Sequence, residues 1–403
     1  MARTAADEST SELRPRLFVA LELSKDTWKL AFTTSRVGKA QIRDVAARNQ
    51  RAFMEEVRAA KERNGLEAGA AVVSCYEAGR DGFWIHRFLE ANGITNLVVD
   101  PASIEVDRRS RRAKTDRIDA QKLVRLLARH GDGEDVLRVV CVPSVVAEDE
   151  RLLPRQLLTL KRTRVRIGNQ IRAALFLHGV DIDPRKGKFA DEEFLTKLEE
   201  ARQWDGSPLP PELVSSVRMH WEVFALVTRQ IKSLEQRQRQ VLRKARAAGP
   251  ESPETHRKAA KLTQLRGIGD VGAMILVTEF FGWREFNNRK EVAALAGLTG
   301  TPHQSGSSDK DQGISKAGNP RIRRLMVELA WLWLRWQPDS RTTRWFHEHV
   351  GKGGSRSKRK AIVAVARRLL VELWHLAEHD VIPEGAVLKG EASRGSQEAA
   401  HAA

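Results

Sequence analysis

The segment Leu17-Phe18-Val19-Ala20-Leu21-Glu22-Leu23 reads as a buried β-strand interrupted by a single acid. An acid midway along an apolar strand is costly to bury unless something compensates its charge. Residues 28–34 and 39–45 are also rich in strand-forming residues, and short polar turns join them to the first run. We therefore expect these three runs to pair as a meander.

Helical and strand-like patterns alternate after the meander. In chain order they are a helix over residues 50–64, a strand over 70–76 that ends at Glu77, a helix over 81–92 and a strand over 96–100. Three strands, a helix, a strand, a helix and a strand follow the element order of a ribonuclease-H-like (RuvC-like) mixed sheet. The N-terminal part is therefore predicted to be an α/β domain, and the order carries this prediction more than any single segment does.

Beyond residue 145 the strand signals fade and the chain is predicted to be all-α. Residues 151–177 and 214–248 carry Leu, Ile and Val at spacings of three or four among Arg, Gln and Lys. The segment 183–211 between them is rich in Gly, Pro and charge, and we expect a loop or an inserted segment there. Two long amphipathic helices separated in this way favour a helical hairpin or coiled-coil arm, but an ordinary helical bundle fits the pattern equally well.

A third, mostly helical region covers about residues 261–384. It opens with Leu265-Arg266-Gly267-Ile268-Gly269-Asp270-Val271-Gly272, in which apolar helices flank a Gly-x-Gly turn. This pattern is typical of a helix-hairpin-helix, whose backbone N–H groups can bind a phosphate, so Gly267 and Gly269 are candidate nucleic-acid contacts. The whole chain is thus expected to have five parts: a disordered tail (1–16), the α/β domain (17–140), a coiled-coil-like helical region (141–255), a C-terminal helical domain (256–385) and a flexible tail (386–403).

The composition favours a partner that is a polyanion. Lys and Arg total 69 against 52 Asp and Glu, a formal net charge of +17. This balance fits a nucleic-acid backbone, although basic structural and ribosome-associated proteins share it. No apolar run approaches the roughly 18 residues that a membrane span needs. The N-terminus has no apolar segment of the secretory type. Cys75 and Cys141 form neither a metal-ligand pattern nor a disulfide framework. We therefore expect a cytoplasmic protein in which Cys75 is a buried reduced thiol.

Four acids stand where a two-metal phosphoryl-transfer site needs them. Glu22 and Glu77 lie on or at the end of apolar strands, and Asp116 and Asp119 are three apart, so they share one face of a helix. Mg²⁺ (or Mn²⁺) prefers oxygen ligands, and two such ions activate an attacking oxygen and stabilise a leaving one. Each acid taken singly is best explained as a cap of a strand or helix. All four acids in this order along the chain favour a metal site instead. The basic run before the last pair supplies candidate nucleic-acid contacts: Arg108, Arg109, Arg111, Arg112 and Lys114.

A stretch rich in Gly, Pro and Ser, residues 296–319, precedes a helix with three arginines. The hydroxyl of Ser305 stands beside Gly306, which lets a bulky phosphodiester approach closely. Four basic side chains can offset charge on a phosphorane-like transition state: Lys316, Arg321, Arg323 and Arg324. From the residues alone, a flexible basic loop that touches backbone phosphate is the preferred interpretation, and the alternatives to Ser305 are Ser307, Ser308 and Ser315.

The acidic segments resemble the three motifs of the DEDD-type insertion-sequence transposases, which are related to Piv-type invertases. The segments are Leu21-Glu22-Leu23-Ser24-Lys25-Asp26, Tyr76-Glu77-Ala78 and Lys114-Thr115-Asp116-Arg117-Ile118-Asp119-Ala120. The family usually has Asp at the first position, whereas Glu22 is longer by one methylene. The resemblance implies a recombinase of a bacterial mobile element that acts on double-stranded DNA (element ends and target), guided by a non-coding bridge RNA. It further implies a homodimer or homotetramer associated with the nucleoid.

The block from Ala296 to Leu325 is similar to the C-terminal transposase domain of the same family, in which a serine in a Ser-Gly step forms a covalent phosphoserine with DNA. Ser305 is the matching position, and Ser315 becomes a phosphate contact. The resemblance covers about residues 17–130 and 260–335. A metal-dependent nuclease of the Holliday-junction-resolvase type, which needs the acids but no serine, is the alternative. A non-catalytic nucleic-acid-binding protein is the third hypothesis.

Three tryptophans, Trp331, Trp333 and Trp336, lie close together in the last helical region. Aromatic side chains can stack on the bases of single strands. At helical spacing beside leucines, however, we expect these three to belong to the core.

Overall fold

The computed structural model describes residues 15–104, 115–185, 191–305, 308–350 and 353–390. It divides into two compact units, Met1–Val142 and Pro143–Ala403. None of the helices in the described ranges combines the length and apolar character needed to cross a bilayer.

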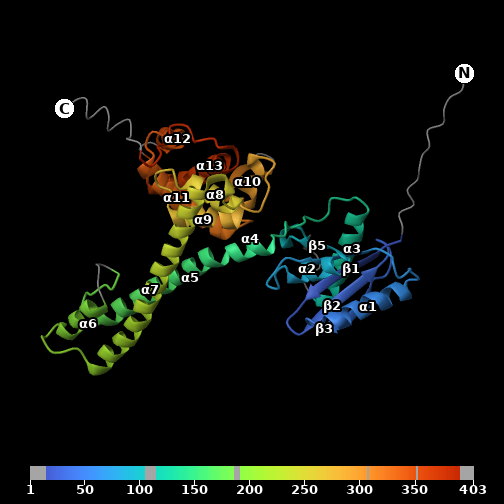
Figure 1. Cartoon of the computed structure of the whole chain (residues 1–403), viewed down its shortest axis with the longest axis horizontal. Helices are drawn as coiled ribbons and strands as arrows, with labels where there is room; N and C mark the ends of the chain where they lie inside the picture. Colours follow the sequence, from blue (N-terminus) through green and yellow to red (C-terminus); the bar gives the residue numbers. More distant parts are fainter. Residues whose placement is uncertain (1–14, 105–114, 186–190, 306–307, 351–352, 391–403) are drawn as a thin grey trace, which may run out of the picture. The chain divides into compact units, whose positions relative to one another are not determined.

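The first unit is built on a five-stranded mixed sheet in the order β3-β2-β1-β4-β5. The sheet lies in the blue part of Figure 1. The strands are β1 (Leu17–Leu23), β2 (Thr27–Thr33), β3 (Gln41–Ala46), β4 (Val72–Glu77) and β5 (Thr95–Val99). The first three strands pair antiparallel as the predicted meander, whereas β4 is parallel to β1 and β5 is parallel to β4. The predicted order of strands and helices is confirmed, with ends that shift by a few residues.

Side chains of β1 alternate between two cores, one on each face of the sheet. Leu17, Val19 and Leu21 pack with α1 (Gln50–Arg63) and α2 (Trp84–Ala91). Phe18 and Ala20 pack on the other face with α3 (Asp116–Gly131). Glu22 continues this second series, so the α3 face of the sheet carries an acid at the carboxyl end of β1.

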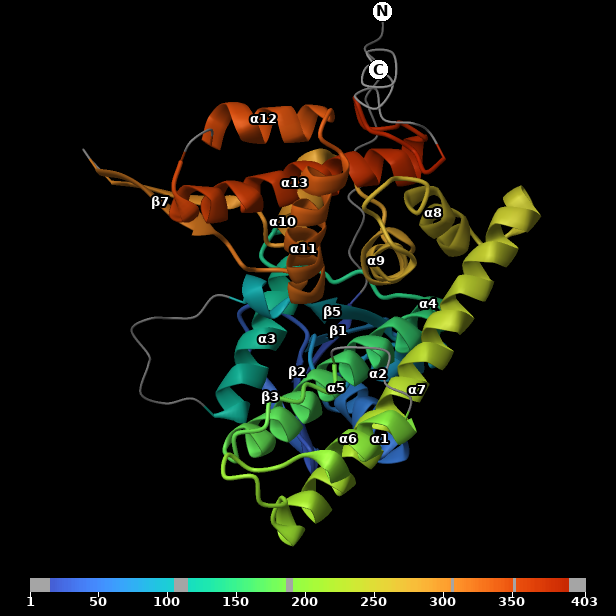
Figure 2. The ribbon, with the colours of Figure 1, turned by 90° about the vertical axis from the view of Figure 1, so that its left-hand side faces the viewer.

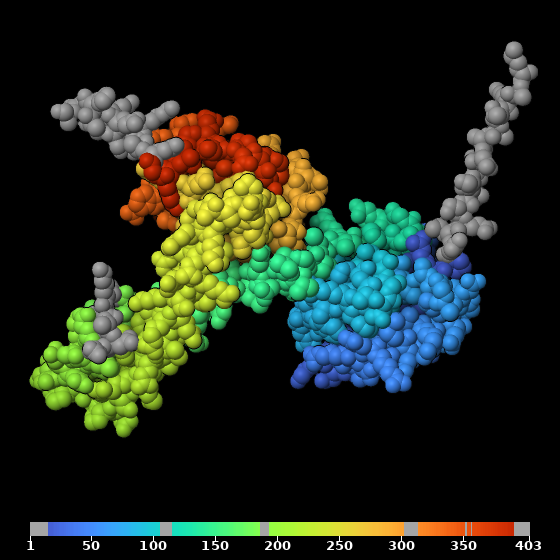
Figure 3. All heavy atoms as spheres, viewed as in Figure 1, coloured from blue at the N-terminus to red at the C-terminus, as the bar shows by residue number. Residues whose placement is uncertain are grey.

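The second unit begins with a long helical hairpin. After the short α4 (Val145–Glu150), α5 (Leu152–Phe176) packs along α7 (Pro211–Ala248), and Figure 3 shows the pair projecting from the helical cluster of the same unit. Both predicted long helices are present. The segment 183–211, predicted to be a loop or insert, contains the helix α6 (Asp191–Glu200). Phe194 of α6 stacks on Trp221 of α7 with ring centroids 3.9 Å apart, a tertiary contact that local composition does not reveal.

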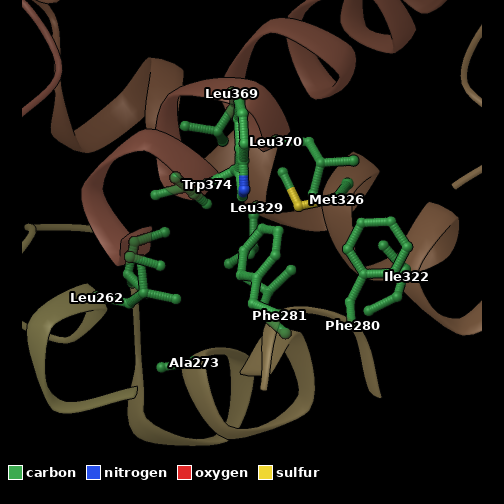
Figure 4. Close-up of a cluster of buried hydrophobic side chains, with 14 of the residues drawn as sticks. Leu262, Ala273, Phe280, Phe281, Ile322, Met326, Leu329, Leu369, Leu370 and Trp374 are labelled. Carbon is green, nitrogen blue, oxygen red and sulfur yellow. The ribbon is translucent and has the colours of Figure 1, made fainter. Parts of the chain in front are cut away.

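The remaining helices form a cluster with its own core (Figure 2). They are α8 (Glu254–Leu262), α9 (Asp270–Leu276), α10 (Arg289–Leu295), α11 (Pro320–Trp336), α12 (Arg341–Val350) and α13 (Ser355–His379). Figure 4 shows side chains that fill this core, among them Phe280, Phe281, Met326 and Trp374. A two-stranded hairpin, β6 (Gly300–Ser305) and β7 (Ser308–Ile314), stands where the sequence predicted a loop.

Candidate active site

Glu22 and Glu77 lie side by side at the carboxyl ends of two parallel strands. The β1–β4 register pairs Leu21 with Tyr76, so Glu22 and Glu77 are the next residues of the two strands. Residues in register on paired strands point to the same face, and neighbouring strands are about 4.8 Å apart. Both carboxylates therefore stand on the α3 face of the sheet, Glu22 half-buried and Glu77 exposed.

Helix α3 brings two further acids toward the same edge of the sheet. A Cβ on Gly131, its last residue, would lie 2.7 Å from the ring of Phe18, so the end of α3 lies over the start of β1. Because α3 also packs along β1 and β2, we infer that it runs antiparallel to β1, with its first turn toward the carboxyl end of that strand. Thr115 caps this turn, which contains Asp116 and Asp119. The helix dipole favours negative charge at that position.

The lengths of the two elements indicate how close the four acids come. From Phe18 to Glu22, β1 advances about 13 Å at 3.3 Å per residue. From Gly131, α3 advances about 18 Å to Asp119 and about 22 Å to Asp116 at 1.5 Å per residue. Asp119 therefore lies nearer the glutamates, and Asp116 extends past the edge of the sheet.

The donor set fits a hard divalent cation, because all four side chains supply carboxylate oxygens. Among the described residues, however, no three Asp, Glu, His or Cys side chains are gathered closely enough to hold a metal ion. The acids thus converge on one edge of the sheet without forming a closed set of ligands.

Lys29 stands next to Glu22 on the same face. The β1–β2 register places Lys29 opposite Glu22, and the β2–β3 register places Asp44 opposite Lys29. The Lys29 ammonium donates to both carboxylate oxygens of Asp44, at 2.8 and 3.1 Å. A row of three carboxylates and one ammonium therefore crosses the sheet from β3 to β4.

Several predicted nucleic-acid contacts precede the first turn of α3 in the chain. The basic residues of this run lie outside the described residues: Arg108, Arg109, Arg111, Arg112 and Lys114. The described chain resumes at Thr115, one residue before Asp116.

Ser305, the predicted nucleophile, is the last residue of β6. Its register partner is Ser308, the first residue of β7, so Ser305 lies at the closed end of the hairpin. Gly306 and Ser307 between them are outside the described residues. The Ser-Gly step in the sequence pointed to this segment, but the sequence did not predict that the segment forms two strands.

The base of the hairpin is closely packed against the segment that follows it. A Cβ on Gly297 would lie 2.3 Å from the carbonyl oxygen of Ala317, and a Cβ on Gly318 would lie 2.3 Å from that of Leu295. The N–H of Ser315 donates to the carbonyl oxygen of Thr299 at 2.8 Å, which joins the two chains below the strands. These contacts fix where the hairpin leaves the helical cluster.

The four basic residues predicted to act beside the serine have different surroundings. The Arg323 guanidinium donates to the carbonyl oxygens of Ala296 and Lys316, at 3.3 and 3.0 Å, so it holds the base of the hairpin together. Lys316, Arg321 and Arg324 are exposed. Their cationic groups are therefore accessible to a phosphate.

The Gly-x-Gly turn lies between α8 and α9, as the helix-hairpin-helix pattern predicts. Gly267 has a φ of +84°, and a Cβ there would meet Trp336 at 3.3 Å. Carbonyl groups of the turn are bound within the protein: Ile268 accepts from the Lys389 ammonium at 2.9 Å. Lys389, which the sequence placed in the flexible tail, is thus itself bound to this turn, while Gly269 remains exposed at the start of α9.

Two features of the second unit were not predicted from the sequence. One is an ion pair between the half-buried Arg155 and the buried Glu279. The other is a basic groove between α5 and α11, which includes Arg162 and Arg166. The spacing of four between these two arginines on a predicted helix is the signal that could have shown a shared basic face.

Two family models match two parts of the chain, one that carries Glu77, Asp116 and Asp119 and one that carries Ser305. The model described as "Transposase IS116/IS110/IS902 family" matches residues 259–345, which include Ser305. The DEDD model of the IS110 type, described as "Transposase", matches residues 23–178 and so begins one residue after Glu22.

Curated proteins match most of the chain. A Sinorhizobium fredii protein that bears the transposase name y4rJ is 41% identical over 382 residues, which cover 93% of this chain and 94% of that protein. The transposase for insertion sequence element IS1111A of Coxiella burnetii is 22% identical over 87% of this chain and 84% of its own length. The transposase for insertion sequence element IS1533 of Leptospira borgpetersenii is 23% identical over 79% of this chain and 86% of its own length.

Proposed function

This chain belongs to the IS110 family of insertion-sequence transposases, which are DNA-processing enzymes, and we propose that it cleaves and rejoins DNA through a covalent phosphoserine at Ser305. The observation that carries the proposal is the convergence of Glu22 and Glu77 with the first turn of α3 at one edge of the sheet. Acids on strand ends and a helix start are an arrangement suited to phosphoryl transfer. The ribonuclease-H-like (RuvC-like) topology that we infer for this unit agrees with it.

In the proposed reaction the Ser305 hydroxyl attacks the scissile phosphorus. The serine oxygen–phosphorus bond forms, the bond from phosphorus to the leaving DNA oxygen breaks, and that oxygen takes up a proton. The phosphoserine keeps the energy of the phosphodiester, so a DNA hydroxyl can later attack the same phosphorus and release the serine. Strand exchange then needs no external energy source.

The chain's own charges suit this chemistry. Glu22, Glu77, Asp116 and Asp119 would hold Mg²⁺ or Mn²⁺, which supplies charge neutralisation at the phosphoryl oxygens when bound. Lys316 and Arg321 are exposed near the base of the hairpin, where they can bind nonbridging oxygens of the same phosphate, and Arg324 is exposed about one turn further along α11. Arg323 positions the hairpin through its hydrogen bonds to the carbonyl oxygens of Ala296 and Lys316.

The partners follow from family resemblance and charge. We propose double-stranded DNA at the element ends and target, together with a non-coding bridge RNA, because the net charge of +17 fits two polyanionic partners. We assign the acidic chemistry to residues 17–140, the arm to 141–255 and the serine chemistry to 256–385. A homodimer or homotetramer would bring acids and serine from different subunits together.

The test is a search for a covalent protein–DNA adduct. Protein, DNA of the element end, RNA from the flanking element and magnesium are incubated, and the adduct is sought on a denaturing gel. Ser305→Ala should abolish the adduct and strand exchange, whereas Ser308→Ala, the matched control across the hairpin, should retain both. Asp116→Asn should abolish them as well.

Two outcomes would overturn the proposal. Cleavage that persists in Ser305→Ala without any adduct would identify a hydrolytic nuclease of the Holliday-junction type. Full activity of Asp116→Asn would show that the acids have no catalytic role.

A further inference from the structure

A groove lies between α5 and α11 in the second unit, and both helices can be followed in Figure 2. Its volume is about 760 Å³. The polar side chains that line it are Lys161, Arg162, Arg166, Asn169 and Gln170 of α5, and Arg324 and Glu328 of α11. Four cations and one carboxylate make the groove strongly positive.

Most of the cationic side chains in this groove have no ion-pair partner among the described residues. The Lys161 ammonium pairs with Glu235 of α7 at 2.7 Å. Arg162, Arg166 and Arg324 are exposed, and among the described residues none of the three has an ion-pair or hydrogen-bond partner. Three guanidinium groups without an ion-pair partner, gathered in one groove that holds a single carboxylate, favour a bound anion, because guanidinium binds phosphate with directed N–H donors.

Exposed aromatic residues continue the groove along α11. Arg324, Glu328, Trp331 and Arg335 are spaced by four, three and four, so they share one face of the helix. Trp331 is 45% exposed, and so it does not belong to the core as the sequence analysis expected. Only Trp333, 0% exposed, meets that expectation.

Trp336 lies beside this face, nearer the Gly-x-Gly turn. It is 48% exposed, and the Arg335 guanidinium stands 5.3 Å from the centre of its ring. Arginine and tryptophan side chains thus alternate along the groove and the adjoining face of α11.

Alternating cations and exposed rings suit one class of ligand. Arginine binds the backbone of a single strand, and an aromatic ring stacks on an unpaired base, whereas bases inside a duplex are not free to stack on a side chain. A protein partner would need carboxylates to match three free guanidinium groups, whereas a nucleic-acid strand supplies such charge at every residue.

We propose that the α5–α11 groove and the adjoining face of α11 bind a nucleic-acid strand with unpaired bases. Arg162, Arg166 and Arg324 hold its backbone, and Trp331 stacks on a base. The strand is either DNA opened for exchange or an RNA loop, since the two share this chemistry. This inference rests on the proposed function, because strand exchange by a transposase exposes unpaired strands, but binding to the groove requires no cleavage.

The test measures equilibrium binding by fluorescence anisotropy with labelled oligonucleotides of one sequence: single-stranded DNA, single-stranded RNA and duplex DNA. The full-length double variant Arg162→Ala/Arg166→Ala should lose at least about 10-fold in single-strand affinity. Its slope of log K against log salt should become shallower by about 1.4, since each phosphate contact on a single strand contributes about 0.7. The control pair, Arg239→Ala/Arg243→Ala, is exposed on α7 with the same spacing and should lose much less.

Trp331→Ala should weaken single-strand binding by about 5- to 150-fold, the range of base–aromatic stacking, and should leave duplex binding nearly unchanged. Trp331→Phe, which keeps a stacking ring, should restore most of the affinity. The matched control is Trp204→Ala, because Trp204 is 86% exposed in the loop before α7. The single strand that binds with the higher affinity, DNA or RNA, is identified as the natural ligand of the groove.

Equal losses for the groove pair and the α7 pair would overturn the proposal, since only unspecific charge would then be measured. Unchanged affinity of Trp331→Ala combined with a changed oligomeric state would assign the α11 face to a protein contact instead. Ser305→Ala should bind every oligonucleotide like the wild type. Failure of the serine mechanism and failure of the groove are therefore seen separately.

Discussion

Arg155 on α5 binds Glu279 through two hydrogen bonds, from Nε at 2.5 Å and from an Nη at 2.8 Å. Glu279 is only 2% exposed and lies in the π-helical turn Val277–Phe281 that follows α9. Burial acts to raise the pKa of Glu279, but the hydrogen bonds and charge of Arg155 outweigh it, so this pKa lies below its ordinary value. The pair therefore fastens the long helical hairpin to the cluster that carries the serine.

Arg155→Ala should lower the free energy of unfolding of the second unit by about 2–3 kcal/mol. Breaking a fully buried pair costs about 3–5 kcal/mol, and the 37% exposure of the Arg155 side chain reduces this through solvent screening. Urea denaturation followed by circular dichroism at pH 7 measures the change. Arg172→Ala on the same helix is the control, because Arg172 pairs with Asp181 only at the surface and should cost less than about 1 kcal/mol. Equal losses in the two variants would contradict the importance of the buried pair.

The same pair predicts how stability depends on pH. Because the folded pKa of Glu279 is depressed, the unfolded chain binds more protons between the two pKa values, and stability rises with pH there. Its contribution is complete above the unfolded value, about 4.3, and is lost as the pH falls through the folded pKa. Urea denaturation from pH 7 to pH 3 should show the wild type losing its advantage over Glu279→Gln below about pH 4.3. An advantage that grows toward low pH would refute this assignment.

The sequence predicts well what short-range patterns determine. The strands and helices of the first unit follow apolar periodicity, whereas the adjacency of Glu22 and Glu77 depends on the parallel pairing of β1 with β4, which are distant in the chain. The helix α6 was missed because its stability comes from Phe194 stacking on Trp221, a contact between segments distant in the chain. The α5–α11 groove was missed for the same reason, and so was the difference between the exposed Trp331 and the buried Trp333. Which side of a helix is covered depends on tertiary packing.

The two cysteines should differ sharply in reactivity. Cys75 is 0% exposed in β4, and burial raises the pKa of its thiol far above the ordinary value, as the sequence analysis anticipated for a buried reduced thiol. Cys141 is exposed. A thiol reagent at pH 8 should therefore titrate one thiol in the native protein and two in urea, and Cys141→Ser should leave none reactive in the native state. Rapid labelling of Cys75 in the folded protein would show that β4 is not buried as described.

The base of the serine hairpin should tolerate no side chain at Gly318. Its φ of +111° is unfavourable for any L-residue, and a Cβ would lie 2.3 Å from the Leu295 carbonyl oxygen. Gly318→Ala should cost at least about 1 kcal/mol of stability and should reduce adduct formation, because the hairpin would shift. Gly300→Ala is the control, since a Cβ at Gly300 meets no atom within 4 Å. If Gly318→Ala matched this control in melting temperature and adduct yield, the close packing at this site would be disproved.

Glu22 provides the sharpest test of the acidic edge. Glu22→Gln keeps the shape of the side chain but loses its charge, and it should reduce cleavage at least about 100-fold, because a cation stabilises the transition state by several kcal/mol and each 1.36 kcal/mol is tenfold in rate. Glu22→Asp keeps a carboxylate on the same face of β1, retracted by one methylene. It should remain active with an altered preference between Mg²⁺ and Mn²⁺, because Mg²⁺ demands stricter geometry.

Binding of Mn²⁺ by calorimetry separates this effect from folding. Glu22→Gln should bind the ion more weakly than the wild type, whereas Glu55→Gln, which removes an exposed carboxylate from α1, should not. If the Glu22→Gln variant cleaved DNA and bound Mn²⁺ as well as the wild type does, the cation would need no ligand from β1. The site would then have to be rebuilt around Glu77 and the first turn of α3 alone.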